Sequence, residues 1–386
     1  MQSNKLKFVL LMGISMLVFG NVFAQTTQTN KPTALNIQST AVPFMMISPD
    51  ARSGGMGNLS LGMTPEANDL FGNTAKLPYL KEPKGFLINY TPWLKDLGLN
   101  DVYLASAGFY KILNDQSAIN TSLRFFSLGN IDFTDENGST NLPSQRPSEF
   151  SYDVGYSLLL NDKLSIGATI RYIHSQLVKG PYSNIEYKAG NTVSGDVSLF
   201  YRANPNMNGL HAGLLLSNLG GKISYSNETK NKYFIPANIG LGIGYLNKID
   251  PENSIEFGAD VNRLMVPSTP DQSDVESTNH YFSQSVINSY FSSFSSKYGI
   301  PFSESLKIST GIEYNYSNQF FLRGGYFMDN NKSLGNMQYF TLGTSFQYTS
   351  ENVKAKFNIS YLIPSGGGIT KNPLSNTLRF GTVFFF

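Results

Sequence analysis

The chain has 386 residues, no cysteine, and 29 basic against 27 acidic side chains. Without cysteine a disulfide framework is excluded, and the near-neutral balance provides no basic field for nucleic acid. Aromatic residues make up 13% of the chain and charged residues only 15%, a composition typical of a large antiparallel β protein with aromatic girdles.

The first 24 residues have the pattern of a secretory signal peptide. Two lysines precede an apolar run from Phe8 to Phe19, which is too short to span a bilayer. Val22 and Ala24 occupy the minus-three and minus-one positions of a cleavage site, so we expect cleavage before Gln25. Removing this peptide takes away two lysines and no acid, which leaves a neutral mature chain.

Residues 25–84 differ from the rest of the chain. A polar lead, which we expect in the periplasm, is followed by a glycine-rich stretch at 48–57 and a second motif at 64–77. In the second motif Thr64 can cap a short helix that has Pro65 at its first position. Because glycines allow tight turns close to other backbone, we expect a compact segment rather than strands.

From residue 85 to residue 386 the pattern changes to alternating apolar and polar residues, which predicts strands. In 164–172, for example, Leu164 and Ile166 alternate with Ser165 and Gly167. A transmembrane strand needs about 9–11 residues, and the candidates match that length. The fourteen candidates are 85–91, 102–112, 118–127, 149–160, 163–176, 193–203, 209–217, 236–247, 253–263, 304–316, 319–328, 336–348, 352–362 and 376–386.

The connections between these candidates alternate in length. Short turns such as 161–162 follow even-numbered strands, and long loops such as 264–303 mostly follow odd-numbered ones. Short turns on one side and long loops on the other mark an outer-membrane barrel, with the short turns in the periplasm. The sequence therefore predicts an all-β membrane protein, a fourteen-stranded antiparallel transmembrane β-barrel. No later stretch is apolar enough for a transmembrane helix.

The last candidate strand ends on an aromatic residue with no polar tail. Leu378, Phe380, Phe384 and Phe386 fall on one face, and Arg379 falls on the other. In a closed barrel this strand would pair with the first, and the pattern resembles the C-terminal signal read by outer-membrane insertion machinery. We expect Phe384 and Phe386 to belong to that insertion signal. The last strand of a soluble sandwich is the alternative.

Few residues suggest chemistry. With three histidines, His174, His211 and His280, and no cysteine, we expect no metal site. The strictly alternating glycines of 240–244 mark one face of a strand rather than a dinucleotide loop. A Ser-His-Asp arrangement stays open, although no Gly-x-Ser-x-Gly elbow is present. We expect no catalytic residue, no cofactor and no enzymatic activity.

Charged residues on the strands are expected to face the lumen, where a solvated wall explains them better than a selectivity ring. They are Arg171, Glu313, Lys354, Lys356 and Arg379.

The loop at 264–303 contains apolar residues at helical spacing, which predicts one helix with an apolar face. Two interpretations stay open: a helix folded onto the barrel mouth, and a docking surface for a partner protein, because an exposed apolar patch marks a contact site. The predicted partner-binding residues are Phe282, Val286, Tyr290, Phe291 and Phe294, with Ile287 on the same face.

A family resemblance rests on the stretches 49–57 (Pro-Asp-Ala-Arg-Ser-Gly-Gly-Met-Gly) and 66–77 (Glu-Ala-Asn-Asp-Leu-Phe-Gly-Asn-Thr-Ala-Lys-Leu). With the signal peptide and fourteen strands, they make the chain similar to FadL-type barrels, whose N-terminal residues plug the lumen as a hatch. Within that group the chain resembles the PorV family of the Bacteroidota type IX secretion system. Asn73-Thr74-Ala75 stands where related hatches carry Asn-Pro-Ala. The resemblance assigns to the hatch Asp50, Arg52, Gly55, Gly57 and Asn73.

The resemblance implies a location in the cell outer membrane, in contact with its lipid, and a role in protein secretion. Such a protein would bind cargo through its C-terminal signal domain at the type IX translocon barrel and shuttle it to the surface attachment complex. A FadL-like uptake channel for hydrophobic small molecules is the alternative. A lipid-modifying enzyme is a third class, without a visible catalytic constellation. An apolar lumen track that opens to lipid would favour uptake, whereas bulky loops and a stable plug would favour protein docking.

Overall fold

The computed structural model describes residues 38–94, 98–131, 144–182, 185–227, 232–269, 274–295, 300–330, 337–351, 353–364 and 376–386. The predicted signal peptide, its cleavage before Gln25 and the polar lead lie outside the described residues. Within the ranges given, no helix combines the length and the apolar character needed to cross a membrane.

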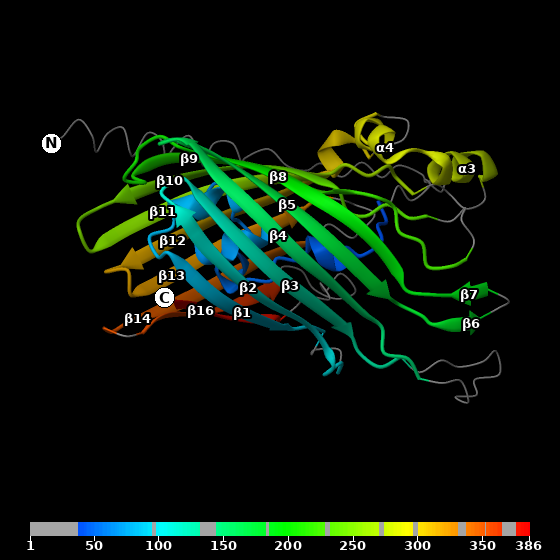
Figure 1. Ribbon diagram of the computed structural model, residues 1–386, viewed down its shortest axis with the longest axis horizontal. Coiled ribbons are helices and arrows are strands. Elements are labelled where there is room, and N and C mark those ends of the chain that lie inside the picture. The colour runs from blue at the N-terminus through cyan, green and yellow to red at the C-terminus, as the bar shows by residue number, and fades with distance from the viewer. Residues whose placement is uncertain are drawn as a thin grey trace, which may run out of the picture. The chain divides into compact units, whose positions relative to one another are not determined.

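Fourteen antiparallel strands form a closed barrel, which confirms the predicted architecture (Figure 1). Most strands pair with their neighbours in sequence, and β1 closes the barrel against β16. The barrel strands are β1 (Lys84–Pro92), β2 (Val102–Asn114), β3 (Ser117–Leu128), β4 (Ser148–Asn161), β5 (Leu164–Gln176), β8 (Gly190–Arg202), β9 (Gly209–Gly220), β10 (Asn238–Lys248), β11 (Asn253–Leu264), β12 (Leu306–Tyr316), β13 (Phe320–Asp329), β14 (Gln338–Thr349), β15 (Lys354–Pro364) and β16 (Leu378–Phe385).

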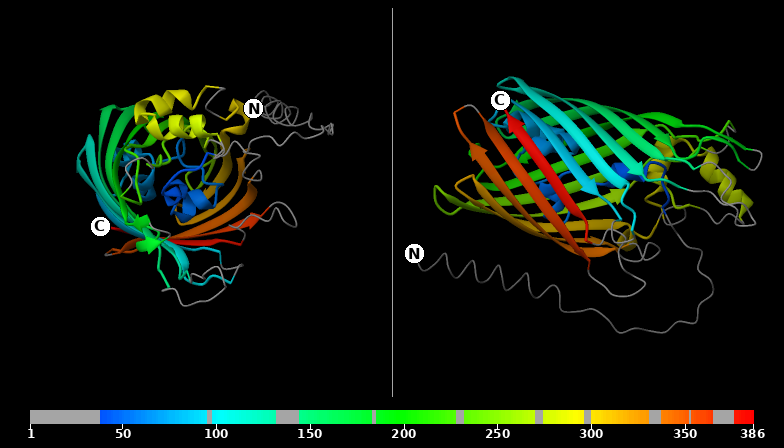
Figure 2. Two further views of the ribbon diagram at one scale, coloured as in Figure 1. Left: turned by 90° about the vertical axis from the view of Figure 1, so that its right-hand side faces the viewer. Right: turned by 90° about the horizontal axis from the view of Figure 1, so that it is seen from below.

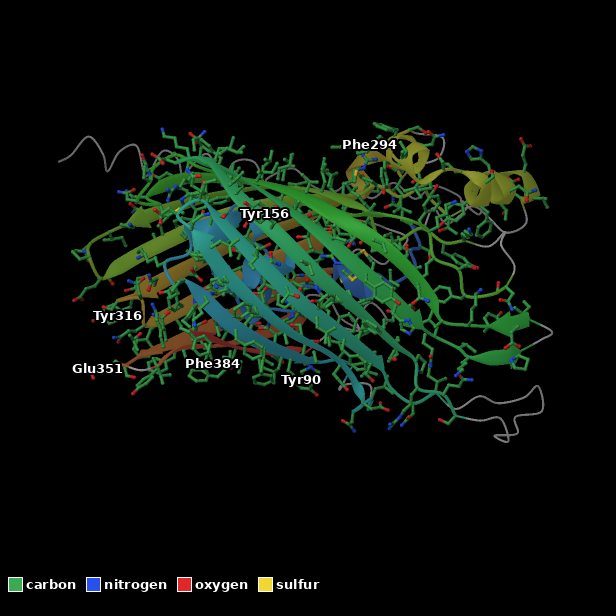
Figure 3. The ribbon with its side chains drawn as sticks, viewed as in Figure 1. Tyr90, Tyr156, Phe294, Tyr316, Glu351 and Phe384 are labelled. Carbon is green, nitrogen blue, oxygen red and sulfur yellow. The ribbon has the colours of Figure 1, made fainter. Side chains whose placement is uncertain are left out.

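The closing seam uses the two-faced strand at the C-terminus. The register of β1 and β16 runs from Gly85 opposite Phe385 to Tyr90 opposite Phe380, and the Phe386 amide donates to the Lys84 carbonyl at 3.1 Å. On β16 the outward Phe380 is exposed and the inward Val383 is buried. In the barrel as a whole, outward positions are largely apolar, and many are exposed, such as Tyr90 and Tyr156; Phe384 is partly exposed. Figure 3 labels all three residues. This outward face forms the lipid-facing belt.

The long loops lie at one end of the barrel, which we call the outer end, and the short turns lie at the periplasmic end. Sequence analysis missed a hairpin at the outer end, formed by β6 (Gly180–Tyr182) and β7 (Ile185–Tyr187) inside the long connection that follows β5. A run of three residues is too short for its alternation to stand out from a loop.

The single helix predicted in the loop at 264–303 is wrong. The structure has two helices, α3 (Val275–Ser283) and α4 (Val286–Ser292), followed by the short η5 (Phe302–Glu304). The chain is extended at Gln284, with ψ of 134°, and the Ser285 hydroxyl accepts from the Asn288 amide at 3.3 Å to begin α4. Because a serine cap restarts the helix, the five predicted partner-binding residues do not share one helical face.

Residues 38–83, the inner segment, lie inside the barrel (Figure 2). The segment contains η1 (Pro43–Met46), α2 (Ala51–Gly54), η2 (Ala67–Phe71) and η3 (Thr74–Tyr79). It starts at the outer end, where the Ala41 amide donates to the Phe234 carbonyl at 2.9 Å, and it ends at the periplasmic end, where β1 begins at Lys84. The inner segment therefore runs the length of the lumen.

Candidate functional site: the filled lumen and the outer rim

The main polar contact in the lumen is made by Arg52. Asp50 begins α2 by accepting from the Ser53 amide at 2.7 Å, and this cap aims the next turn at the barrel wall. The guanidinium of Arg52 then binds Glu313 of β12 with two hydrogen bonds, Nε to Oε2 at 3.0 Å and Nη2 to Oε1 at 2.9 Å. A bidentate pair of this kind fixes both position and orientation.

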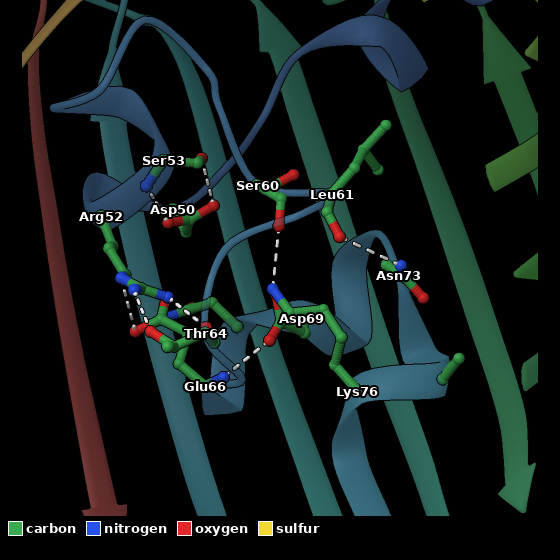
Figure 4. A network of polar contacts seen from close by, with 12 residues as sticks. Asp50, Arg52, Ser53, Ser60, Leu61, Thr64, Glu66, Asp69, Asn73 and Lys76 are labelled. Carbon is green, nitrogen blue, oxygen red and sulfur yellow. Dashed lines mark hydrogen bonds and ion pairs between the residues drawn. The ribbon is translucent and has the colours of Figure 1, made fainter. Parts of the chain in front are cut away.

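Two further carboxylates surround the same guanidinium. Glu256 of β11 lies 3.4 Å from Nη2. Glu66 of the inner segment, labelled in Figure 4, lies 3.9 Å from Nε. Burial alone would lower the pKa of Arg52, but Glu313, Glu66 and Glu256 raise it well above its usual value. Arg52 therefore holds the inner segment against two adjacent strands.

Thr64 does not cap a helix, contrary to the sequence-based expectation. The capping residue of η2 is Glu66, and Thr64 instead accepts from Arg52 through its carbonyl at 2.8 Å and its hydroxyl at 2.9 Å. Its amide also donates to Glu256 at 2.7 Å. Thr64 thus bonds to Arg52 and to the barrel wall instead of to a helix amide, and a capping rule based on neighbouring residues does not include such distant partners.

A second polar contact lies between the turns of the inner segment. Lys76 pairs with Asp69 at 2.6 Å and donates to the Ser60 carbonyl at 2.8 Å (Figure 4). Burial raises the pKa of Asp69 to about 7, although Lys76 opposes that rise. Asp260 of β11 accepts from the amides of Ser60 and Leu61 at 2.7 and 2.9 Å, so this turn is also tied to the wall.

A third contact lies within the wall itself. Arg171 of β5 forms hydrogen bonds of 2.9–3.0 Å with Asp153 of β4 and Asp196 of β8. The predicted solvated lumen wall is therefore wrong for four of the five residues: Arg171, Glu313, Lys356 and Arg379 face inward as expected but are buried. Lys354 is partly exposed. The inner segment fills the space that water would occupy, so these charges need partners.

The predicted hatch residues each contact the wall or shape the segment. Gly57 has φ of +67°, and a Cβ there would lie 2.5 Å from the Tyr326 carbonyl oxygen. A Cβ at Gly55 would lie 2.9 Å from the Cα of Gly343. Asn73 donates to the Leu199 carbonyl at 3.0 Å. These contacts suit a tightly seated segment, because only glycine allows backbone to approach backbone so closely.

The described part of the lumen contains at least two cavities. The first, toward the outer end, has a volume of about 220 Å³ and is lined by charged residues that include Arg124, Arg171 and Asp260. The second, toward the periplasmic end, has a volume of about 600 Å³, with Glu82, Lys356 and other charged residues in its lining. Both linings mix charged with apolar side chains, such as Met45 and Phe71 in the first cavity and Phe321 and Val383 in the second.

At the outer rim, α3 is held by buried aromatic contacts. Tyr281 packs in a cluster with Phe234 and Val266, and Phe282 lies against the same cluster. Lys222 donates to the Phe282 carbonyl at 3.0 Å. Burial, and secondarily Lys232, lowers the pKa of Lys222 to about 8.

The five predicted partner-binding residues thus have different environments. Phe282 is partly buried against the α3 cluster, and Tyr290 accepts from the Gly220 amide through its hydroxyl at 3.0 Å. Val286 is half-buried, whereas Phe291 and Phe294 are exposed. Only the last two present large apolar surfaces to the surroundings.

Two of the three histidines pack against other side chains. His211 is buried on the lumen side, 3.6 Å from Glu256, and His174 stacks on Phe150 with the ring centroids 5.0 Å apart. Among the residues that the structure describes, no group of three or more His, Asp or Glu side chains is arranged to hold a metal ion.

Sequence reasoning missed the carboxylates that complete the lumen network. Glu256, Asp260, Asp153 and Asp196 are all buried. The signal was present, since each is a charged residue at an inward position of an alternating strand. Their partners, however, lie on other strands and on the inner segment, so the pairing depends on the barrel register.

A closed fourteen-stranded barrel with an apolar outward face and a filled lumen defines an outer-membrane β-barrel of the FadL type. Solved structures support this class. The P. putida toluene transporter TodX is similar at a TM-score of 0.51 and 11% identity, over 86% of this chain and 97% of that one. The Ralstonia pickettii toluene transporter TbuX is similar at a TM-score of 0.50 and 12% identity, over 87% and 98%. At this identity the likeness concerns the fold alone.

The family is given by sequence. The model of the family described as type IX secretion system protein PorV matches residues 29–272, and the chain belongs to that family. It is therefore an outer-membrane component of the type IX secretion system. A search of curated proteins gave no match.

Proposed function

We propose that this protein binds secreted cargo through the C-terminal signal domain of the cargo, at the type IX translocon barrel, and carries it to the surface attachment complex. The observation that carries the proposal is the family match over residues 29–272. In this role the protein has no catalytic step and needs no cofactor, because its work is done by binding.

The filled lumen supports docking over passage. The inner segment is bound to the wall by Arg52, Asp260 and Asn73, and charged side chains interrupt the apolar lining of both cavities. A route for hydrophobic molecules would need an apolar track instead. The barrel therefore serves best as a rigid platform whose loops meet protein partners outside the membrane.

We place the docking surface at the outer rim, on the β6–β7 hairpin and α3. The hairpin is joined to the next long loop by a bridge between Tyr187 and Ser226, and α3 rests on the cluster around Tyr281. Loops positioned by a rigid scaffold are the usual place for binding residues. Translocon, cargo and attachment complex would then meet the protein on its cell-surface side.

A pull-down with the C-terminal signal domain of a secreted protein tests this proposal. The tagged wild-type barrel should retain the domain, and a variant with residues 180–187 replaced by a glycine-serine turn should retain much less. A matched variant in the short periplasmic turn, Glu252→Ser, should bind as well as wild type, because Glu252 is exposed at the opposite end. Equal retention by all three proteins would contradict the placement, and no retention by the wild type would contradict the function.

The alternative is uptake of hydrophobic small molecules, which the fold shared with the two toluene transporters favours. It is tested by measuring toluene entry into proteoliposomes. Entry above that of empty liposomes would support uptake. We expect none, because the inner segment fills the lumen.

A further inference from the structure

Helix α4 is amphipathic, but its apolar face points away from the protein, whereas on a water-soluble protein that face is buried. Ser289, within the helix, and Ser293, its C-cap residue, are fully buried. In contrast, the apolar side chains of Ile287, Phe291 and Phe294 are 68%, 75% and 50% exposed. The three apolar residues follow helical spacing and so share a face. The small polar residues face the protein and the large apolar residues face away. In water this arrangement would be unfavourable.

The position of α4 explains this orientation. On the barrel, α4 covers Arg263 of β11. Side chains alternate along a strand, and Asp260 points inward to the inner segment, so Arg263, three residues further along, points outward. Arg263 donates to the Ser293 carbonyl at 3.1 Å, and its guanidinium lies 4.4 Å from the ring of Phe294 and 5.2 Å from that of Phe302. Helix α4 is thus fixed to the outside of the wall, where Figures 1 and 3 also place it.

The height of α4 follows from the register of the strands. Arg263 stands in a row between Ile239 of β10 and Leu306 of β12. The next outward row toward the periplasm contains Leu241, Val261 and Ile308, which belong to the lipid-facing belt. Helix α4 therefore sits directly at the outer edge of that belt, and its apolar face continues the belt.

The composition of this stretch is also that of a lipid contact. From Tyr281 to Ser295 the sequence contains no charged residue, so the exposed face has no charge to keep in water. The charge beneath α4, Arg263, is covered by two aromatic rings and a carbonyl. Aromatic residues are enriched where a membrane protein meets the boundary of the hydrocarbon.

We propose that α4 is an interfacial anchor, which lies in the outer leaflet with Ile287, Phe291 and Phe294 against lipid acyl chains. This inference goes beyond the role in cargo transport and does not depend on it. The anchor would fix the height of the outer rim relative to the membrane surface, because α4 is joined to α3 by two residues, Gln284 and Ser285.

The absence of cysteine makes the test direct, because a single introduced cysteine is a unique label site. We would prepare Phe291→Cys, label it with an environment-sensitive fluorophore, and place the purified full-length protein in nanodiscs that contain lipids with brominated acyl chains. Leu241→Cys, on the belt at 56% exposure, is the lipid control. Val275→Cys, on α3 at 68% exposure, is the water control.

We expect the label at position 291 to be quenched by the brominated chains to an extent close to that at 241, with a blue-shifted emission. The label at 275 should keep a water-like emission and little quenching. Should Phe291→Cys disturb the helix, Ile287→Cys at 68% exposure reports on the same face. Water-like behaviour at both 287 and 291 would overturn the proposal. So would a label that becomes shielded only when a cargo C-terminal domain is added, because α4 would then be a protein-docking surface.

Discussion

Two arginines on opposite sides of the barrel wall show how the chain accommodates a charge away from water. Arg52, in the lumen, is neutralised by carboxylates, with Glu313 bound at 2.9 Å and Glu256 at 3.4 Å. Arg263, on the outward face, has no carboxylate in contact among the described residues; aromatic rings and a carbonyl cover it. The inside of the barrel buries charge by pairing it, and the outside does so by covering it.

The difference has an energetic meaning. Removing one member of a buried ion pair leaves the other charge unpaired, which costs far more than the pair itself contributes. A charge covered by aromatic rings leaves nothing unpaired when it is removed, so its loss should be mild. The lumen network is therefore expected to dominate the stability of the filled barrel, and the outer contact to govern only the position of α4.

The largest expected effect comes from Arg52→Met. This substitution takes the shared partner from the buried Glu313 and Glu256 and the partly buried Glu66. Arg323 still pairs with Glu313 and Lys356 with Glu66, so we expect a destabilisation at the lower end of about 3–5 kcal/mol. The measurement is urea-induced unfolding in lipid vesicles, followed by the gel-shift difference between folded and unfolded barrel.

The matched control for this prediction is Lys354→Met. Lys354 pairs with Glu82 at the periplasmic end, and both side chains are partly exposed, so its loss should cost about 0–1 kcal/mol. If the two variants unfolded at the same urea concentration, the lumen network would not be the main support of the inner segment.

A smaller effect is expected from Gly57→Ala. The residue has φ of +67°, and its new Cβ would meet the Tyr326 carbonyl oxygen at 2.5 Å. A non-glycine residue held in this conformation costs about 1–3 kcal/mol, and the inner segment must shift away from the wall to relieve the clash. Ion conductance across a planar bilayer should therefore rise above that of wild type.

Gly324→Ala is the control for this substitution, because its Cβ would meet only Ile312 at 3.8 Å. Its conductance should stay at the wild-type level. Equal conductance of Gly57→Ala and wild type would mean that the segment tolerates the shift without opening the lumen.

The barrel could be predicted from the sequence because each strand carries its own evidence. On β16, for instance, one short stretch of sequence is enough to predict that Phe380 faces outward and Val383 faces inward. The same holds for turn and loop lengths, which are properties of neighbouring residues. Architecture was therefore readable from local patterns, and the strand ends lie within a few residues of the expected ones.

The lumen and the rim could not be predicted in the same way, because their contacts join distant parts of the chain. Asp153 and Asp196 meet Arg171 only through the register of three strands. The outward position of Arg263 was visible from alternation, but the helix that covers it was not. The apolar spacing alone predicted one continuous helix, but in the structure the chain is extended at Gln284 and the cap at Ser285 begins a second helix.

The smallest expected effect is that of Arg263→Met. The substitution removes the hydrogen bond to the Ser293 carbonyl and a cation–π contact of about 0.5–2 kcal/mol between the buried Arg263 and the half-exposed ring of Phe294. Because methionine suits the apolar row of Ile239 and Leu306, the urea midpoint of the barrel should change little. Amide hydrogen exchange in α4 should instead become faster, since the helix loses its attachment to the wall.

Arg263→Lys keeps the charge but not the planar group that stacks on two rings, so its α4 amides should exchange at a rate between those of wild type and the methionine variant. The contrast between the two faces depends on this result. If Arg263→Met lowered the urea midpoint as much as Arg52→Met does, Arg263 would support the barrel itself. Covering a charge with aromatic rings would then be as important to this wall as pairing it, and the helix would be part of the structural core rather than an attachment to it.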